Sequence, residues 1–315
     1  SRPMQLYVAV DQSSASADYS GPMQLYVAVD ESDAPATSPH QHVSKQARQS
    51  DAILESMTTA TFRFHRELNE FLARPQREQA FACVCPVAST TKHMIEALGV
   101  PHTEVSLILR NGLPTGFDTL MEDTDFIDVY PPGVMPRALE IVHPLRAPLR
   151  LETLRFIADA HLGGLAQLLR LAGFDTCYDN HFPDDEIEQL ALVEHRVVLT
   201  RDRELLKRRS LVHGCYVRTL QPDAQWREVA TRLGLAQHVR PFRLCLMCNA
   251  PLRRASADEV SDRVPEGVLE RHARFVTCDV CRRVFWEGSH WKRMRARIEE
   301  LMDGAPGNPP VPASG

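Results

Sequence analysis

The sequence predicts an α/β protein with three folded parts. Strand-like and helix-like segments follow one another over residues 57–132, and a second such pattern runs over 152–240. Two Cys-x-x-Cys pairs then mark a different unit over 241–302. The remaining segments read as a flexible leader, a proline-rich linker and a disordered tail, over residues 1–56, 133–151 and 303–315 respectively.

Composition limits the classes of function. The chain has 315 residues, of which 43% are hydrophobic and 24% charged, as in ordinary globular proteins. Its net charge of -5 excludes an overall basic coat for duplex nucleic acid, so any such contact must come from a local patch. Because no apolar run reaches about 18 residues and the start lacks the apolar core of a signal peptide, we expect a cytoplasmic protein without membrane contact.

The leader contains an internal repeat. Residues 4–11 recur verbatim as residues 23–30, and residues 32–56 are rich in Ser, Ala, Pro, His and Gln. The string Gly21-Pro22-Met23 is typical of a cloning junction, so we interpret the leader as foreign or mispredicted sequence, with Met57 as the natural start. The alternative is a short strand that adds to the sheet edge of a partner.

The first folded part has the element order of a β-grasp domain. Its turn Asn111-Gly112 tolerates the positive φ of a hairpin, and Gly99 ends the helix. The expected order is strand, strand, helix, strand and strand. Alternating apolar residues from Phe62 indicate the first strands, a helix follows over 91–98, and the last two strands lie over 105–109 and 126–130.

The second part alternates strands with helices, which favours right-handed crossovers and a parallel sheet. We expect strands over 154–158, 176–178 and 196–200, and helices over 162–171, 184–194 and 203–208.

Acidic residues occur where this sheet would bind a ligand, beyond the carboxyl ends of its strands. Asp159 follows the first strand, Asp202 follows the third, and the cluster Asp184-Asp185-Glu186 opens the helix between them. Converging carboxylates need a hard cation such as Mg²⁺ or Mn²⁺, and this pattern outlines a phosphodiester-cleaving site. The alternative is that Asp184 and Asp202 only cap helices.

Basic residues crowd the same edge. Arg201, Arg203 and Lys207 are the candidates for positioning a phosphate backbone, with Arg208 and Arg209 beside them. The alternative is a solvated helix face.

The two Cys-x-x-Cys pairs predict a zinc ribbon. Cys245, Cys248, Cys278 and Cys281 supply a tetrahedral set of four thiolates, which leaves no open position and so favours structural zinc. The 29 residues between the pairs exceed the usual spacing, so a loop or small helix is expected there. A redox or disulfide role is the alternative.

The tail of this unit is basic and aromatic. Residues 271–297 hold eight basic and two acidic side chains, interleaved with Phe285, Trp286 and Trp291. Such a surface suits single-stranded RNA, although a tryptophan in a buried core is the alternative. The candidate RNA-binding residues are Arg282, Arg283, Trp286, His290, Trp291, Lys292 and Arg293.

Several strings resemble the Mut-seven C-terminal RNase family over roughly residues 154–293. They begin at Phe156-Ile-Ala-Asp159-Ala-His161, Pro183-Asp184 and Val198-Leu-Thr200, and the ribbon strings from Cys245 and Val284 follow. The resemblance implies a PIN-like nuclease fold. It assigns Asp159, Asp184 and Asp202 as metal ligands, adds Asp185 and Glu186 to the acidic site, and gives Thr200 the role of ordering it.

The first part resembles the ubiquitin-like domain often joined to this RNase, through Phe62-Arg-Phe64, the run over 95–105 and Asn111-Gly112. Related β-grasp proteins carry sulfur on a free Gly-Gly end. Here Pro131-Pro132-Gly133 continues into a linker, so we expect docking to a protein partner or help in holding substrate.

Together these patterns predict a metal-dependent endoribonuclease that uses Mg²⁺ or Mn²⁺ on RNA, with a zinc ribbon that aids RNA binding. The alternatives are a non-catalytic RNA-binding or ribosome-associated adaptor and a toxin-like RNase.

Overall fold

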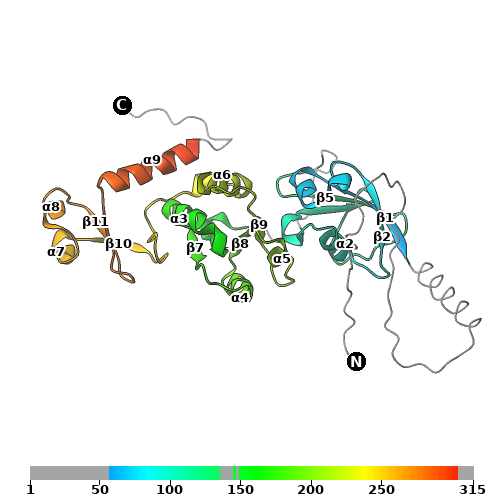
Figure 1. Cartoon of the computed structure of the whole chain (residues 1–315), viewed down its shortest axis with the longest axis horizontal. Coiled ribbons are helices and arrows are strands. Elements are labelled where there is room, and N and C mark those ends of the chain that lie inside the picture. The colour runs from blue at the N-terminus through cyan, green and yellow to red at the C-terminus, as the bar shows by residue number, and fades with distance from the viewer. Residues whose placement is uncertain (1–56, 135, 137–144, 147–148, 304–315) are drawn as a thin grey trace, which may run out of the picture. The chain divides into compact units, whose positions relative to one another are not determined.

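The computed structural model describes residues 57–134, 136, 145–146 and 149–303, which form three sheets with their helices (Figure 1). The interpretations of the leader and of the tail after residue 303 lie outside the described residues, as does that of most of the linker. Within the described part, no helix has the length and apolar character needed to cross a membrane.

The first sheet is a mixed five-stranded sheet in the order β2-β1-β5-β3-β4, in which β1 runs parallel to β5 and the other pairs are antiparallel. Phe62, Ile95 and Ile127 are fully buried in its core. This order confirms the β-grasp fold. Its elements are β1 (Thr58–Phe64), β2 (Phe81–Cys85), α2 (Thr91–Ala97), β3 (Leu107–Arg110), β4 (Leu113–Thr115) and β5 (Phe126–Tyr130), with short 3-10 helices at Arg66–Phe71, Arg74–Gln76 and His102–Glu104.

The second sheet has four strands, all parallel, in the order β7-β6-β8-β9. Its strands are β6 (Arg155–Ala158), β7 (Asp175–Tyr178), β8 (Val197–Thr200) and β9 (Gly214–Tyr216). Its helices are α3 (Gly163–Ala172), α4 (Asp184–Glu194), α5 (Arg203–Leu206) and α6 (Pro222–Leu233), with 3-10 helices at Leu151–Thr153, Ala160–Leu162 and Leu235–His238. The parallel sheet is thus confirmed, and β9 and α6 are added to the expected elements.

Alternate strand residues face opposite cores. Phe156 and Leu199 pack with α3 and α6, whereas Ile157 and Val198 pack with Ile187 of α4. Figure 1 shows α3 and α6 on one side of this sheet and α4 on the other. Because both faces are covered, the central strands carry consecutive apolar residues, Phe156–Ala158 and Val197–Leu199, rather than an alternating pattern.

A glycine is required where α3 ends. Gly173 has φ +95°, and a Cβ there would lie 2.1 Å from the carbonyl oxygen of Arg240. The returning chain pairs with this helix end, since the Arg240 N–H donates to the Ala172 oxygen at 2.8 Å. This contact leads the chain from the parallel sheet into the cysteine unit.

The third sheet is antiparallel, in the order β10-β11-β12. Its elements are β10 (Leu252–Ala255), α7 (Ala257–Val260), α8 (Glu266–Leu269), β11 (Phe275–Cys278), β12 (Val284–Trp286) and α9 (Ser289–Asp303). The two short helices α7 and α8 fill the long gap between the cysteine pairs. The sequence pattern did not predict α9, whose Ile298 and Leu301 are buried in the core of α3 and α6.

Candidate functional site

The carboxyl ends of β6 and β8 bring Asp159 and Asp202 to one edge of the parallel sheet. Thr200, the last residue of β8, is fully buried. Its hydroxyl donates to Asp159 Oδ2 at 2.7 Å and accepts from the Asp202 N–H at 2.9 Å. One buried hydroxyl therefore orders both acidic residues, and the half-buried Asp159 is held directly.

Asp202 also caps α5, because its Oδ1 accepts from the Glu204 N–H at 2.8 Å. Asp202 therefore does cap a helix, as the alternative interpretation expects, but it uses only one of its two carboxylate oxygens for this. The side chain is exposed, so capping leaves it open to other ligands at Oδ2.

Asp184, Asp185 and Glu186 occupy the first turn of α4, and a basic residue meets them there. Arg208 pairs with Asp184 at 3.5 Å and with the exposed Asp185. Hydrogen bonds to Asp185 and to a neighbouring glutamate raise the pKa of Arg208. Among the described residues, only the four cysteines form a group of three or more potential metal ligands whose ligand atoms all lie within 4.8 Å of one another. Asp159, Asp184 and Asp202 do not form such a group.

Sequence reasoning missed Asp179, which follows β7 as Asp159 follows β6. The two strands are neighbours, so both acids lie at the same edge. Asp179 is exposed, and it accepts a hydrogen bond from the His181 N–H at 2.9 Å. Its position directly after a strand was the available signal.

The basic candidates of this edge make contacts of their own. Arg201 donates to the Thr219 oxygen at 2.9 Å, and Lys207 pairs with Glu204 at 2.8 Å. Arg203 reaches the β-grasp domain, where its guanidinium lies 5.0 Å from the Phe71 ring centroid. Arg203 is thus engaged with protein rather than free for a phosphate.

The β-grasp domain is joined to β9 through a buried carboxylate. Glu104 is fully buried and accepts from the Tyr216 N–H at 2.7 Å and from Arg232 at 2.8 Å. Arg218 adds a third contact at 3.4 Å. From the linker, Arg146 donates to main-chain oxygens of both domains, and burial lowers its pKa to about 10.

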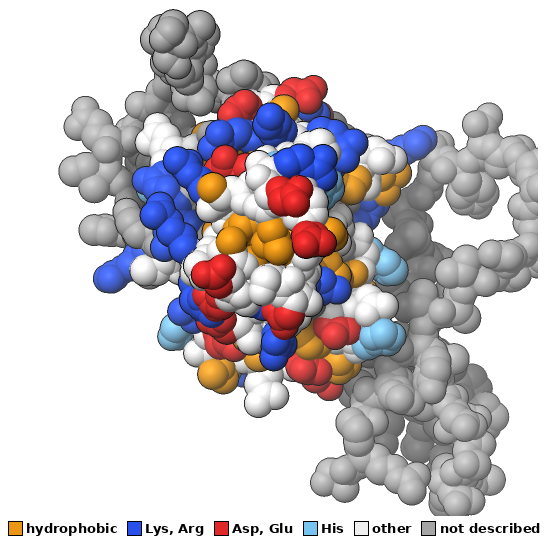
Figure 2. All heavy atoms as spheres, turned by 90° about the vertical axis from the view of Figure 1, so that its left-hand side faces the viewer, with side chains coloured by type: hydrophobic (Ala, Val, Ile, Leu, Met, Phe, Trp, Pro, Cys, Tyr) orange, Lys and Arg blue, Asp and Glu red, His pale blue; other side chains and the backbone are white. Residues whose placement is uncertain are grey.

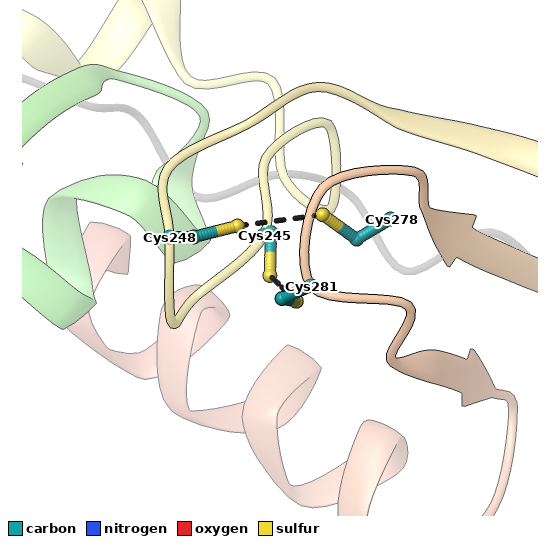
Figure 3. Close-up of side chains that lie close together, drawn as sticks. All are labelled: Cys245, Cys248, Cys278 and Cys281. Carbon is teal, nitrogen blue, oxygen red and sulfur yellow. Dashed lines mark hydrogen bonds between the residues drawn. The ribbon is translucent and has the colours of Figure 1, made fainter.

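Four cysteine sulfurs converge in the second candidate site (Figure 3). The sulfurs of Cys245 and Cys281 are 3.5 Å apart, and those of Cys248 and Cys278 are 3.4 Å apart. A disulfide requires about 2.05 Å. Zn–S bonds of about 2.3 Å in a tetrahedron place sulfurs about 3.8 Å apart, so the cluster can bind zinc with thiolate at every position.

Two matching turns carry these thiols. Asn249 N–H donates to the Cys245 oxygen and Arg282 N–H to the Cys278 oxygen, each at 2.9 Å. Asn249 and Arg282 have φ of 63° and 59°, which closes each turn. Burial raises the pKa of Cys245 to about 12. Burial also acts on Cys281, but hydrogen bonds from the Arg283 N–H and from neighbouring thiols outweigh it and lower the pKa of Cys281 to about 6.

The first of these turns rests on the parallel-sheet domain. Buried Arg170 of α3 donates to the oxygens of Leu246 and Met247 at 3.1 and 3.0 Å. Asn249 accepts from the Thr176 N–H at 3.0 Å and donates to Asp175 at 2.6 Å. Burial of Asp175 is outweighed by its hydrogen bonds to Arg196 and Asn249, so its pKa is lowered.

The aromatic candidates of the cysteine unit are half-buried. Trp291 stacks on Phe242 with ring centroids 3.7 Å apart, and Trp286 packs against the small core around Phe275. The candidates Arg282, Arg283, His290, Lys292 and Arg293 are exposed. Figure 2, which faces this end of the molecule, shows Lys and Arg side chains gathered along its upper and left margins.

Two family models match the folded parts of the chain. The family model described as the Mut7-C RNAse domain matches residues 154–298, and the one described as Mut7-C ubiquitin matches residues 57–134. Among solved structures, the H. volcanii small archaeal modifier protein 1 is 17% identical, with 24% of this chain and 98% of that chain covered and a TM-score of 0.20. No curated protein matches the chain.

Proposed function

Because this chain belongs to the Mut7-C RNase family, a group of ribonuclease-like hydrolases that act on RNA, we propose that it is a metal-dependent endoribonuclease. The observation that carries this proposal is the Thr200 hydroxyl, which orders Asp159 and Asp202 at the carboxyl edge of the sheet. That edge is where parallel α/β sheets bind ligands. As part of the same proposal, the parallel-sheet domain has a PIN-like nuclease fold.

Carboxylate oxygens are the ligands that Mg²⁺ and Mn²⁺ prefer. Asp159 and Asp202 would hold such an ion with the oxygens that Thr200 and Glu204 leave unused. Asp184 on α4 does not group with them within 4.8 Å, so it would meet the ion through a bound water. The ion supplies charge neutralisation and a lowered pKa of bound water. Glu186 would add negative charge beside the ion, Asp185 is paired with Arg208, and Thr200 holds Asp159 in place.

We further propose that the four cysteines hold structural zinc and that the basic surface beside them binds RNA. All four positions are thiolates, so this metal folds the unit and does no chemistry. Arg282, Arg283, Lys292 and Arg293 are exposed there and suit phosphate contacts.

The test is a time course on labelled single-stranded RNA with Mg²⁺ or Mn²⁺. We expect cleavage by the wild type and at least about a 100-fold loss in Asp159→Asn/Asp202→Asn, because a metal-activated step contributes several kcal/mol. The matched control is Asp118→Asn/Asp258→Asn, which removes the same charge from two exposed carboxylates.

RNA affinity measured on the same proteins separates the rival function. A nuclease variant keeps binding while cleavage is lost. A wild type that binds RNA yet cleaves none with either ion contradicts the proposal and supports a non-catalytic adaptor.

A further inference from the structure

A hollow of about 520 Å³ lies where the three-stranded sheet meets α9. Its walls come from all three strands, from α9 and from Pro241 and Phe242, which precede the first cysteine. The volume falls within the range of about 300–1,000 Å³ that small-ligand sites occupy. We propose that this hollow holds unpaired nucleotides of the RNA, an inference that rests on the proposed function because it specifies the form of its substrate.

Aromatic rings form much of the wall. Phe242, Phe285, Trp286 and Trp291 all line the hollow and all are half-buried. Trp291 is supported by its stack on Phe242. Trp286 lies opposite Phe275 on the other face of the sheet from Phe285 and is supported there by the small core that contains Phe275. Rings fixed in this way offer preformed surfaces on which bases stack, whatever the base.

Three arginines line the same hollow: Arg254 from β10, Arg274 just before β11 and Arg295 from α9. All three are exposed. One acid opposes them, Glu287, which lies 3.9 Å from Arg274. The net charge of this wall is therefore positive, as phosphates require.

Strand register places cation and ring together. Arg254 lies opposite Val276, and Val276 lies opposite Phe285 on the next strand. Residues that are directly opposite share one face of a sheet, so the guanidinium and the ring border the hollow from the same side. A wall that combines flat rings with guanidinium groups matches the bases and phosphates of single-stranded RNA better than an acidic peptide, which would leave the rings without a stacking partner.

The hollow and the carboxylate edge are independent in sequence. The lining residues lie between 241 and 295, whereas the acidic residues lie between 159 and 202. Binding and cleavage can therefore be changed separately.

The experiment is fluorescence anisotropy of a labelled, unstructured oligoribonucleotide with the zinc-loaded full chain, without Mg²⁺ or Mn²⁺. We expect Arg254→Ala/Arg295→Ala to weaken binding at least about tenfold near 0.1 M salt. The slope of log affinity against log salt should fall by about 1.4, or about 0.7 for each lost phosphate contact. Arg74→Ala/Arg227→Ala is the matched control, since both arginines are exposed and lie outside the hollow.

A second variant tests stacking without a charge change. Phe285→Leu keeps an apolar side chain but removes the ring, and we expect about a tenfold loss of affinity, since stacking on one ring contributes about 1–3 kcal/mol per base. Zinc content and far-UV circular dichroism should match the wild type. An acidic peptide of equal length should compete weakly.

The inference is wrong if Arg254→Ala/Arg295→Ala and Phe285→Leu bind RNA as tightly as the control variant. It is also wrong if an acidic peptide displaces the RNA. Neither result affects cleavage at the carboxylates, which is measured in its own assay. Conversely, a protein that cleaves nothing but binds RNA through the hollow would contradict the nuclease proposal alone.

Discussion

At Thr200, one buried hydroxyl serves two acidic residues. It donates to Asp159 and accepts from the Asp202 main chain, so neither of its two contacts is made with water. The bond to Asp159 holds that side chain, the bond from Asp202 holds only its main chain, and each contributes a net gain of about 1 kcal/mol. The larger consequence is that the Asp159 carboxylate is held at the carboxyl edge of the sheet.

Replacing Thr200 by Val keeps the shape of the side chain and removes the hydroxyl. We expect RNA cleavage to fall roughly 10- to 100-fold, as happens when groups that orient metal ligands are lost. The free energy of unfolding should fall by about 1–3 kcal/mol. Cleavage rates and urea unfolding check both.

The control is Thr91→Val, because Thr91 is also fully buried and its hydroxyl donates to Gly116 and Phe117 of the β-grasp domain. It should lose similar stability and keep cleavage. Equal cleavage losses in the two variants would show that Thr200 acts through stability alone.

Among the elements, the first cysteine turn is fixed by its neighbours as well as by its own thiols. Arg170 and Asn249 connect this turn to α3 and β7. The turn closes only when Asn249 adopts a positive φ, which asparagine tolerates better than most residues. The position of this turn, and of the thiols it carries, therefore depends on contacts with the parallel-sheet domain.

Removal of the metal should disrupt the cysteine unit and leave the two other sheets folded. We expect Cys248→Ser, or a strong chelator, to release about one zinc per chain and to expose residues 241–302 to protease, because the binding energy of a structural zinc is folding energy. Zinc analysis and limited proteolysis measure this outcome.

Cys83→Ser is the control, since Cys83 is a half-buried thiol of β2 that donates only to a main-chain oxygen. It should retain zinc and resist protease. Unchanged zinc in Cys248→Ser would contradict the four-thiolate site.

For the molecule as a whole, the buried Glu104 decides how the β-grasp and parallel-sheet domains are joined. A fully buried carboxylate is costly unless it is paired, and here Arg232, Arg218 and a main-chain N–H supply the partners. Arg203, one residue after Asp202, also contacts the β-grasp domain. The ubiquitin-like domain therefore supports the segment that carries an acidic residue of the proposed site.

Glu104→Gln leaves Arg232 without its charge partner, whereas Arg218 keeps its ion pairs with Glu70 and Glu228. We expect the free energy of unfolding to fall by about 3 kcal/mol, the usual cost of breaking a buried ion pair. Glu122→Gln should change it by less than about 1 kcal/mol, because Glu122 pairs with Arg110 at the surface, where its side chain is 74% exposed. Denaturant unfolding compares them, and equal small effects would show that the Glu104 contacts do not stabilise the junction.

Local patterns in the sequence were sufficient for the central strands and helices of the parallel-sheet domain. The helix over 184–194 has the predicted bounds, and the three predicted strands of the parallel sheet differ from β6, β7 and β8 by a residue at most. Hydrophobic spacing and glycine stops determine such elements because they depend on neighbours a few residues apart. The four cysteines were found for the same reason, since two thiols on one turn form a local motif.

Contacts between distant segments required the tertiary structure. The sequence alone placed Asp159 and Asp202 at one sheet edge, yet the pairing of Asp184 with Arg208 depends on how α4 packs beside the chain after α5. The burial of α9 and the aromatic hollow likewise depend on residues far apart in the chain. Ion pairs and ring contacts between distant segments leave no periodic pattern in the sequence. They stabilise the protein only after the helices and strands that carry them have packed together.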